Sequence, residues 1–372
     1  MKFGDKVKEL EKIMVQNKIR DNYADVIKAI GIISIVIGHS IWYITKYKIQ
    51  IGPFVYSYHL MIFVFVSGYL FNTLKLKENN QYKSKYIANQ IVKMAKLYFI
   101  YNLVFVILHN LFVKLQLINS SYYSTNVIVK NIFNGLTFIT SETLLGAFWF
   151  IPMMLIAKIL FVCVYDKTKN NNKLSLLIMI LFGILGVLLC YKNIHLQYMA
   201  QISILSVFFM YLGLFYKKHF EIVDKYVYKL GFIPSGIIIY MINYLTNSSI
   251  ELSVNIIINP FIFFIISITG IYFCLSLAKF IMQNKFIEDR MADIGKNSFH
   301  IMALHFLFMK IIDIIYCMIK GINDYSVITK FPNSFELWYL YIPFGVILPV
   351  LLIKSLSFIK IKIQNKIPLK KI

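Results

Sequence analysis

The chain has 372 residues, of which 59% are hydrophobic and only 15% are charged. Soluble domains carry about 25% charged residues, and a soluble fold of this size has no way to hide so much apolar surface. The apolar residues also fall in long blocks, which excludes an ordinary soluble protein and indicates one embedded in a bilayer.

The net charge is +22 at pH 7, a value that is also typical of nucleic-acid-binding proteins. The lysines, however, stand at the ends of the apolar blocks and form no separate basic domain. This placement is what the positive-inside rule produces, together with attraction to anionic lipid head groups. We therefore expect the lipid bilayer as a partner and no nucleic acid.

About ten segments are apolar over enough residues to cross a bilayer, which takes about 20 residues in a helix. The sequence therefore predicts an all-α integral membrane protein, a bundle of about ten transmembrane helices. The span 231–245 is the shortest, and the more polar segment 126–139 is expected to be interfacial or re-entrant. The expected spans are residues 24–44, 53–74, 94–113, 147–165, 174–191, 198–216, 231–245, 256–278, 298–319 and 337–353.

The distribution of Lys and Arg predicts which connections face the cytosol. With both termini in the cytosol, 29 basic residues lie on cytosolic segments and 7 on external ones. Residues 1–22 then form a cytosolic N-terminal segment, 23–359 the transmembrane domain and 360–372 a basic cytosolic tail. The start is polar and has no apolar signal-peptide region, so we expect the first span to stay uncleaved.

The first expected span contains ionisable residues, which are costly within a bilayer and usually face the interior of a bundle. At about 100° per residue, Asp25, Lys28 and His39 fall within roughly 60° of one another on the helix. They form one polar stripe, with His39 about 21 Å further along the helix than Asp25. A structural interpretation remains for Lys28, which can extend to the cytosol and pair with Asp25. His39 lies too deep in the membrane to extend to the cytosol in this way.

The second span runs in the opposite direction and carries His59 near its start. His59 therefore reaches an outer-leaflet depth similar to that of His39, and the pattern favours a cavity shared by the two imidazoles. The alternative is a single histidine that bonds to a neighbouring backbone carbonyl.

Three further positions each have two interpretations. Lys93 and Lys96 open the third span one turn apart, where they can hold phosphates or act as positive-inside anchors; spacing alone favours anchors. Trp149, in the run Phe-Trp-Phe-Ile-Pro, is either an aromatic anchor with a proline kink or a wall for a ligand.

The ninth expected span places His305 near mid-membrane, and it carries Lys310 and Asp313 three residues apart, where they can pair. The four cysteines lie in or beside apolar segments without Cys-x-x-Cys or Cys/His ligand spacing. The sequence therefore predicts neither a metal site nor a disulfide framework.

In this order, these segments resemble the membrane acyltransferase 3 family, bacterial O-acyltransferases that modify cell-surface polysaccharides and related glycans. The branch that the chain most resembles is fucose 4-O-acetylase-like. The family opening has the pattern R-x-x-Y-x-D-x-x-K-G followed by G-H. This pattern is matched by Arg20, Tyr23, Asp25, Lys28, Gly38 and His39, with Ala29 where glycine is usual.

Three later elements of the family follow in the same order. The element F-H-M-P-L-F-F-F-x-S-G is matched by His59, Phe63, Phe65, Ser67 and Gly68, and departs at Tyr58, Leu60 and Met61. The elements L-W-F-L-P and I-G-x-N-S-L…H are matched by Trp149, Phe150 and Pro152, and by Ile294, Gly295, Asn297, Ser298 and His305. The family's R-x-x-R pair falls on Lys93 and Lys96, which keep the charge but lose the bidentate guanidinium, and Ile100 stands where proline usually precedes Tyr101.

The resemblance implies an O-acyltransferase of the bacterial cytoplasmic membrane that moves an acyl group, usually acetyl, from cytosolic acyl-CoA to a hydroxyl of a surface polysaccharide or its lipid-linked precursor. Acetyl-CoA is then the donor, and no metal is expected. We expect His39 to act as general base or transient acyl carrier, with His59 orienting the reactants. Donor binding is expected from Arg20, Lys28, Lys93 and Lys96, and support from Asp25, Tyr23, Trp149, Asn297, Ser298 and His305.

Two other functions fit the polar residues. A transporter or flippase for a glycan or acyl group, without chemistry of its own, uses intramembrane ionisable residues equally well. The hypothesis of a purely structural subunit of an export complex does not explain why His39 and His59 lie inside spans.

Overall fold

The computed structural model describes residues 22–41, 43–44, 49–73, 76, 81–140, 142–246, 250–257 and 259–366. Nearly all of the N-terminal segment expected at 1–22, including Arg20, lies outside the described residues, as does the end of the basic tail.

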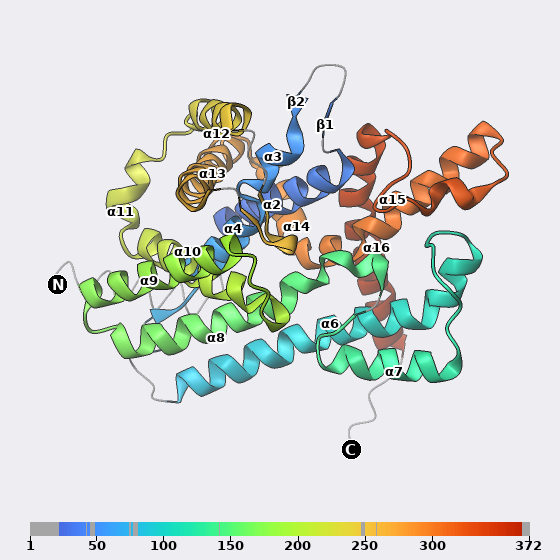
Figure 1. Cartoon of the computed structure of the whole chain (residues 1–372), viewed down its shortest axis with the longest axis horizontal. Helices are drawn as coiled ribbons and strands as arrows, with labels where there is room; N and C mark the ends of the chain where they lie inside the picture. The colour runs from blue at the N-terminus through green and yellow to red at the C-terminus, as the bar shows by residue number, and fades with distance from the viewer. Residues whose placement is uncertain are drawn as a thin grey trace.

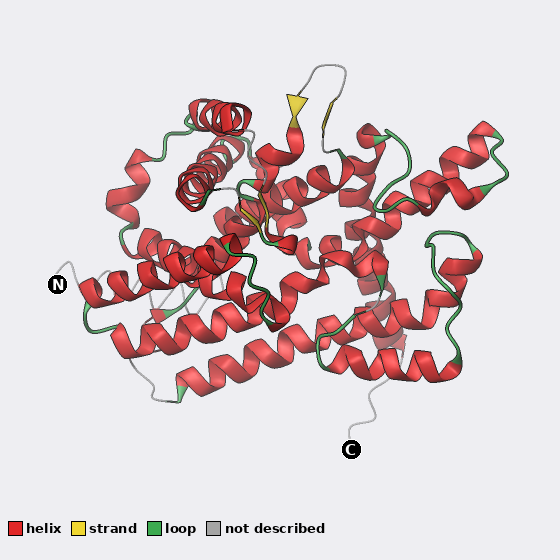
Figure 2. Ribbon diagram, viewed as in Figure 1, coloured by secondary structure: helices red, strands yellow, loops and turns green. Residues whose placement is uncertain are grey.

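The described chain is an all-α membrane bundle, as the sequence predicted (Figures 1 and 2). Nine helical segments within the described ranges are long and apolar enough to cross a bilayer. They are α2 (Asn22–Ser40), α3 (Ile51–Tyr56) with α4 (His59–Tyr69), α6 (Tyr82–Lys114), η2 (Thr143–Trp149) with α8 (Phe150–Thr168), α9 (Asn172–Tyr191), η3 (Gln197–Met199) with α10 (Ala200–Lys218), α13 (Pro260–Ile281), α15 (Ser298–Lys320) and α16 (Trp338–Lys366).

The remaining expected span, 231–245, forms the short apolar helix α12 (Phe232–Thr246), which packs against α13. Its 15 residues extend about 22 Å, which is less than the roughly 30 Å hydrocarbon core of a bilayer. The placement of both termini on one side depends on whether α12 crosses, so that topology stays a prediction.

Shorter elements connect the long helices. Two of them, α7 and α14, are amphipathic helices outside the nine spans. The set comprises the hairpin of β1 (Tyr43–Ile44) and β2 (Ile49–Gln50), α7 (Thr125–Leu136), α11 (Phe220–Val223), η4 (Asp224–Tyr226), the hairpin of β3 (Ile250–Glu251), η5 (Leu252–Val254) and β4 (Ile256–Ile257), α14 (Lys285–Lys296) and η6 (Tyr325–Thr329).

The helix α6 begins at Tyr82, twelve residues before the expected start of the third span at 94. The segment expected to be interfacial or re-entrant forms α7, which packs along α6. Asn102 of α6 donates a 3.1 Å hydrogen bond to the carbonyl oxygen of Asn131 in α7. The amide of Asn102, which is buried in α6, thus has its hydrogen-bond acceptor in α7.

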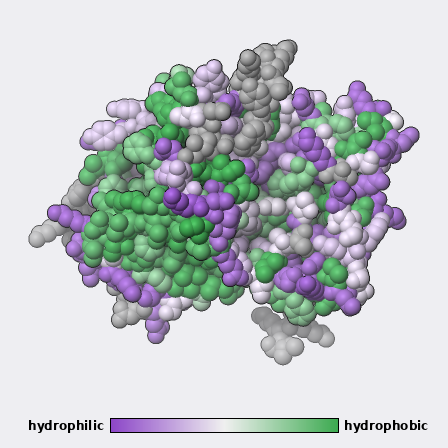
Figure 3. All heavy atoms as spheres, in the orientation of Figure 1, coloured by the Kyte–Doolittle hydropathy of each residue, from purple (hydrophilic) through white to green (hydrophobic). Residues whose placement is uncertain are grey.

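The first two spans lie at the centre of the bundle. In α2 and in the α3–α4 segment 72% of the apolar window is buried, compared with 28% in α6 and 22% in α16. On the opposite extreme, α9 exposes a row of leucines, and Figure 3 shows a broad apolar surface over α9 and α10. The central helices therefore carry the packed interior, and the outer helices present apolar side chains to lipid.

Glycines let the central helices approach backbone to backbone. A Cβ atom built at Gly68 of α4 would lie 1.8 Å from the carbonyl oxygen of Met210, and one at Gly213 of α10 would lie 1.9 Å from that of Phe65. Between α14 and α2, a Cβ atom built at Gly295 would lie 1.8 Å from the carbonyl oxygen of Asp25. Close helix packing through small residues is typical of membrane bundles.

A buried ion pair holds the segment that follows α15. Lys310 and Asp313 pair at 3.2 Å and are 1% and 0% exposed. The Lys310 ammonium also donates to the carbonyl oxygens of Ile328 and Lys330, and Asp313 accepts from the backbone N–H of Ser334 and from the hydroxyl of Tyr341. The pairing expected from the sequence is present, and it fixes the 328–334 segment over the bundle.

The glycine contact between α4 and α10 can be tested by adding one carbon. We expect Gly213→Ala to destabilise the protein by about 1–3 kcal/mol or more, because the new methyl group forces the two backbones apart. The control is Gly236→Ala in α12, where a Cβ meets no atom closer than 3.4 Å and helix propensity gains about 0.5–1 kcal/mol. Thermal unfolding in detergent measures both; equal midpoints for the two variants would contradict the packing argument.

The buried ion pair can be tested by removing one partner. Lys310→Met leaves Asp313 charged and without its cation in the protein interior, which costs about 3–5 kcal/mol. The double variant Lys310→Met/Asp313→Asn should recover part of that stability, because the amide is neutral and still accepts the hydrogen bond from Tyr341. Unfolding measurements on both variants test this prediction. A Lys310→Met variant as stable as the wild type would show that the ion pair does not hold the segment.

Candidate functional site

Three cavities follow one another along α2. The inner chamber, at the Asn22 end of α2, has a volume of about 460 Å³, and the outer chamber, at the Ser40 end, has about 520 Å³. A much smaller cavity of about 50 Å³, which we call the waist, lies between them. The two chambers have no lining residue in common.

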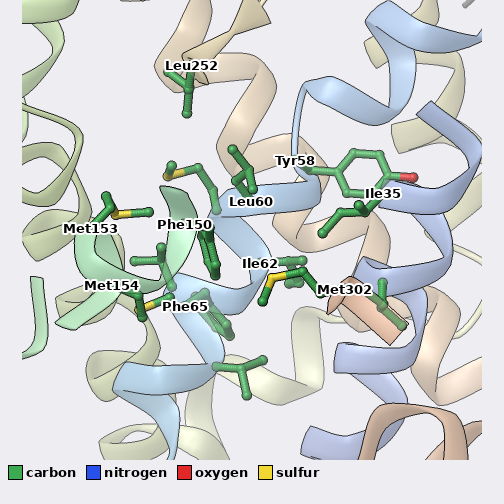
Figure 4. Packing of buried hydrophobic residues seen from close by; sticks show 14 of the residues in the cluster. Ile35, Tyr58, Leu60, Ile62, Phe65, Phe150, Met153, Met154, Leu252 and Met302 are labelled. Atoms are coloured by element: carbon green, nitrogen blue, oxygen red, sulfur yellow. The ribbon is translucent and has the colours of Figure 1, made fainter. Parts of the chain in front are cut away.

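Shared walls show that the waist adjoins both chambers. Ile35, Phe150 and Met302 line the inner chamber and the waist, and Figure 4 shows these three side chains from three different helices. His39 and Trp149 line the waist and the outer chamber. The three cavities therefore form one interrupted passage through the bundle.

One face of α2 borders the whole passage. Lys28 and Ile32 line the inner chamber, Ile35 the inner chamber and the waist, and His39 the waist and the outer chamber. Their spacings of four, three and four residues are those of one helix face. Asp25, which belongs to the predicted polar stripe, is 2% exposed and forms a 2.5 Å ion pair with Lys28.

The inner chamber is strongly cationic. Besides Lys28 it is lined by Lys93, Lys158 and Lys296, and no carboxylate is among its described lining residues. In the described part of the chain these three lysines form no ion pair; Lys158 donates a 3.0 Å hydrogen bond to the amide oxygen of Gln90. Like charges repel, so the cluster is stabilised by an anion or by water.

The start of α15 adds to this electrostatic character. Ser298, the first residue of α15, lines the inner chamber, and the helix extends over 23 residues. The positive end of a helix dipole favours anions, as lysines do. The lysines and this helix start therefore give the inner chamber a positive electrostatic potential.

The waist brings together the two histidines that the sequence placed at matched depth. His39 and His59 both line it, and the ring of Tyr56 packs against each of them, at 6.3 and 4.4 Å between centroids. The Nδ1 atom of His59 lies 3.0 Å from the carbonyl oxygen of Val55. Because a carbonyl only accepts, Nδ1 carries the proton and Nε2 is left as an acceptor.

A break between α3 and α4 positions His59. The chain leaves helical hydrogen bonding at Ser57, whose carbonyl oxygen accepts from Ser267 of α13. Asn243 of α12 donates to the carbonyl oxygen of Pro53 and to the hydroxyl of Ser57. Irregular backbone inside a membrane needs such partners, so α12 and α13 together support the helix break that turns His59 into the waist.

His305 stands directly behind His39. Their rings stack with centroids 5.4 Å apart, and His305 is fully buried. The Nδ1 atom of His305 lies 3.0 Å from the carbonyl oxygens of Ile301 and Met302, whereas its Nε2 has no hydrogen-bond partner among the described residues. The sequence predicts that His305 lies in the membrane interior, but no feature of the sequence predicts that its ring stacks on that of His39.

The outer chamber combines aromatic rings with polar groups. Trp149 and Tyr56 line it, and a role of the tryptophan toward a ligand stays a prediction. Asn333, from the segment held by the Lys310 ion pair, donates a 2.9 Å hydrogen bond to the backbone carbonyl of His39. Glu251 and Lys330 are the charged side chains among its described lining residues.

The structure does not bring every expected residue to the passage. Lys96 is exposed and, unlike Lys93, is not among the lining residues of the inner chamber. Tyr23 bonds to Tyr216 and Leu275 away from the cavities. Asn297 precedes α15 and donates to the carbonyl oxygen of Asp293, which is a role in helix packing.

Sequence reasoning missed several residues of the passage, among them Lys158, Lys296, His300 and Glu251. Lys158 lies inside the expected span 147–165, and the cost of a lysine in a membrane was the available signal for it. His300, assigned no role, lines the inner chamber and lies 2.7 Å from the Tyr101 hydroxyl through its Nδ1 atom. Glu251 lies between apolar blocks, where no periodicity or motif marks it.

Comparison with known proteins identifies the family of the chain. The family model described as an acyltransferase domain matches residues 21–354, which is most of the chain. Neither the curated proteins nor the solved structures contain a match. The matched region includes all three cavities and every helix that lines them. The chain therefore belongs to the membrane acyltransferase family that shares this acyltransferase domain.

Proposed function

We propose that this protein is an O-acyltransferase of the bacterial cytoplasmic membrane, which moves an acetyl group from acetyl-CoA to a hydroxyl of a cell-surface polysaccharide or its lipid-linked precursor. The observation that carries the proposal is the single passage in which His39 lies between a lysine-lined chamber and a polar, aromatic chamber. Donor and acceptor then reach one imidazole from opposite ends.

The inner chamber is proposed to take the donor. Coenzyme A carries three phosphate groups, and Lys28, Lys93 and Lys158 offer ammonium groups around one cavity. With the phosphates held there, the flexible pantetheine arm extends along Ile32 and Ile35 toward the waist. The waist, about 50 Å³, has room for the small thioester end.

His39 is proposed as the general base. Its imidazole takes the proton of the acceptor hydroxyl, the oxygen attacks the thioester carbonyl, and the intermediate collapses to an ester and a thiolate that receives the proton. His59 faces the same cavity and orients the reactants, and His305 fixes the His39 ring by stacking. If His39 instead carries the acyl group covalently, rapid denaturation at neutral pH without an acceptor traps labelled protein, and the label is then released by acid.

A passage lined by polar groups also suits a transporter, the alternative function. The volume of the waist argues against it, because about 50 Å³ corresponds to a few water molecules at most. A sugar ring does not pass such a constriction without a large rearrangement of the central helices. A small reacting group does fit, which favours chemistry over transport.

The role of His39 is tested by His39→Ala. We expect transfer of label from acetyl-CoA to the glycan to fall by about 10²–10⁴-fold, the usual worth of a general base. The measurement uses membranes with matched protein levels. His195→Ala is the control, since His195 is exposed and, within the described ranges, bonds to its neighbour Asn193 alone; turnover of the His39 variant at the wild-type rate would overturn the assignment.

Donor binding is tested by Lys93→Gln and Lys158→Gln. Each should raise KM for acetyl-CoA about tenfold or more through loss of a charge-assisted hydrogen bond. KM for S-acetyl-N-acetylcysteamine, a donor without phosphates, should not change. Lys96→Gln is the matched control, because this lysine lies on the same helix but outside the chamber.

Two results would contradict this donor site. One is an unchanged KM for acetyl-CoA in both chamber variants. The other is an equal loss with the truncated donor, which would indicate a structural effect rather than lost phosphate contacts.

A further inference from the structure

The two chambers differ in charge. Four lysines and no carboxylate line the inner chamber in the described part of the chain, whereas Glu251 and Lys330 line the outer one. A polyanion is therefore attracted to one end of the passage only. The outer chamber, where Glu251 is the one carboxylate among the described lining residues, favours a different kind of molecule.

A rigid hairpin presents Glu251 to the outer chamber. The strands β3 and β4 pair with Glu251 opposite Ile256, and Ile250 and Leu252 are each 4% exposed. Burial of residues on both sides of Glu251 turns its side chain to the other face. Asn255 completes the turn at φ 58° and is fixed by Gln201, whose amide donates to the Asn255 side-chain oxygen at 2.9 Å.

The surroundings of Glu251 place it near His39. The hydroxyl of Ser253 donates to the Glu251 carboxylate at 3.1 Å, and Ser253 lines both the outer chamber and the waist. Glu251 forms no ion pair with any described residue. Lys330, in contrast, is exposed and lines only the outer chamber, so solvent screens its charge.

We propose that Glu251 determines acceptor specificity by selecting a neutral or cationic saccharide and rejecting uronate or phosphorylated sugars. This inference rests on the proposed function and deepens it. A carboxylate only accepts hydrogen bonds, and neighbouring sugar hydroxyls donate to it. Trp149 and Tyr56 supply aromatic surface for the sugar ring. A second anion beside Glu251 is repelled, which discriminates against acidic acceptors.

The experiment compares maltotriose with the same sugar oxidised at its primary hydroxyls to uronates. Equilibrium binding of each labelled sugar to the purified full-length protein is measured, and each is also offered as acetyl acceptor. The wild type should bind the neutral sugar about tenfold more tightly, and Glu251→Gln, which still accepts from Ser253, should narrow the difference to about threefold or less. The matched control Lys330→Gln should keep the preference.

The outcomes separate this inference from the proposed function. A wild type that binds neither sugar or prefers the uronate, a Glu251→Gln variant that keeps the full preference, or a Lys330→Gln variant that loses it overturns the role of Glu251. His39-dependent cleavage of acetyl-CoA, measured in the same samples, reports on the acyltransferase alone. Binding with the expected preference but without acetyl transfer would uphold the acceptor site and count against the proposed reaction.

Discussion

An ionisable group in the core of a bilayer needs a partner or water, and this constraint organises the whole bundle. Lys310 meets it by pairing with Asp313 and by binding two carbonyl oxygens of the 328–334 segment. Lys28 meets it by pairing with Asp25. Lys158 and His39 meet it by facing cavities. The passage exists because the central helices contain polar groups that side-chain partners alone do not satisfy.

The same helices must pack closely enough to keep the passage narrow in the middle. Gly68 and Gly213 bring α4 and α10 into backbone contact, and Gly295 does the same for α14 and α2. Gly31 of α2 packs on α4, where an added Cβ would lie 2.8 Å from the Ile62 side chain. This contact fixes the depth of α4 relative to α2, and therefore the depth of His59 relative to His39. Small residues distant from the waist thus define the geometry of the two imidazoles that line it.

Much of this arrangement could be predicted from local sequence. The apolar blocks predict the helices, and helical periodicity predicts that Lys28 and His39 share a face, because both depend only on neighbouring residues. The choice between Lys93 and Lys96 could not be predicted, since it depends on how α6 rotates against α8. The helix α14 could not be predicted either, because it is polar overall. Its apolar face is buried only because it packs on α2. Glu251 depends on a hairpin of two-residue strands, too short to leave a pattern.

The narrowness of the waist has an electrical consequence. Wide polar chambers approach it from opposite ends of α2, so the voltage across an energised membrane falls mainly over the short apolar stretch between Ile35 and His39. Moving one elementary charge through 100 mV changes its free energy by about 2.3 kcal/mol. Any charge that shifts across the waist therefore experiences most of the potential difference between the two faces of the bilayer.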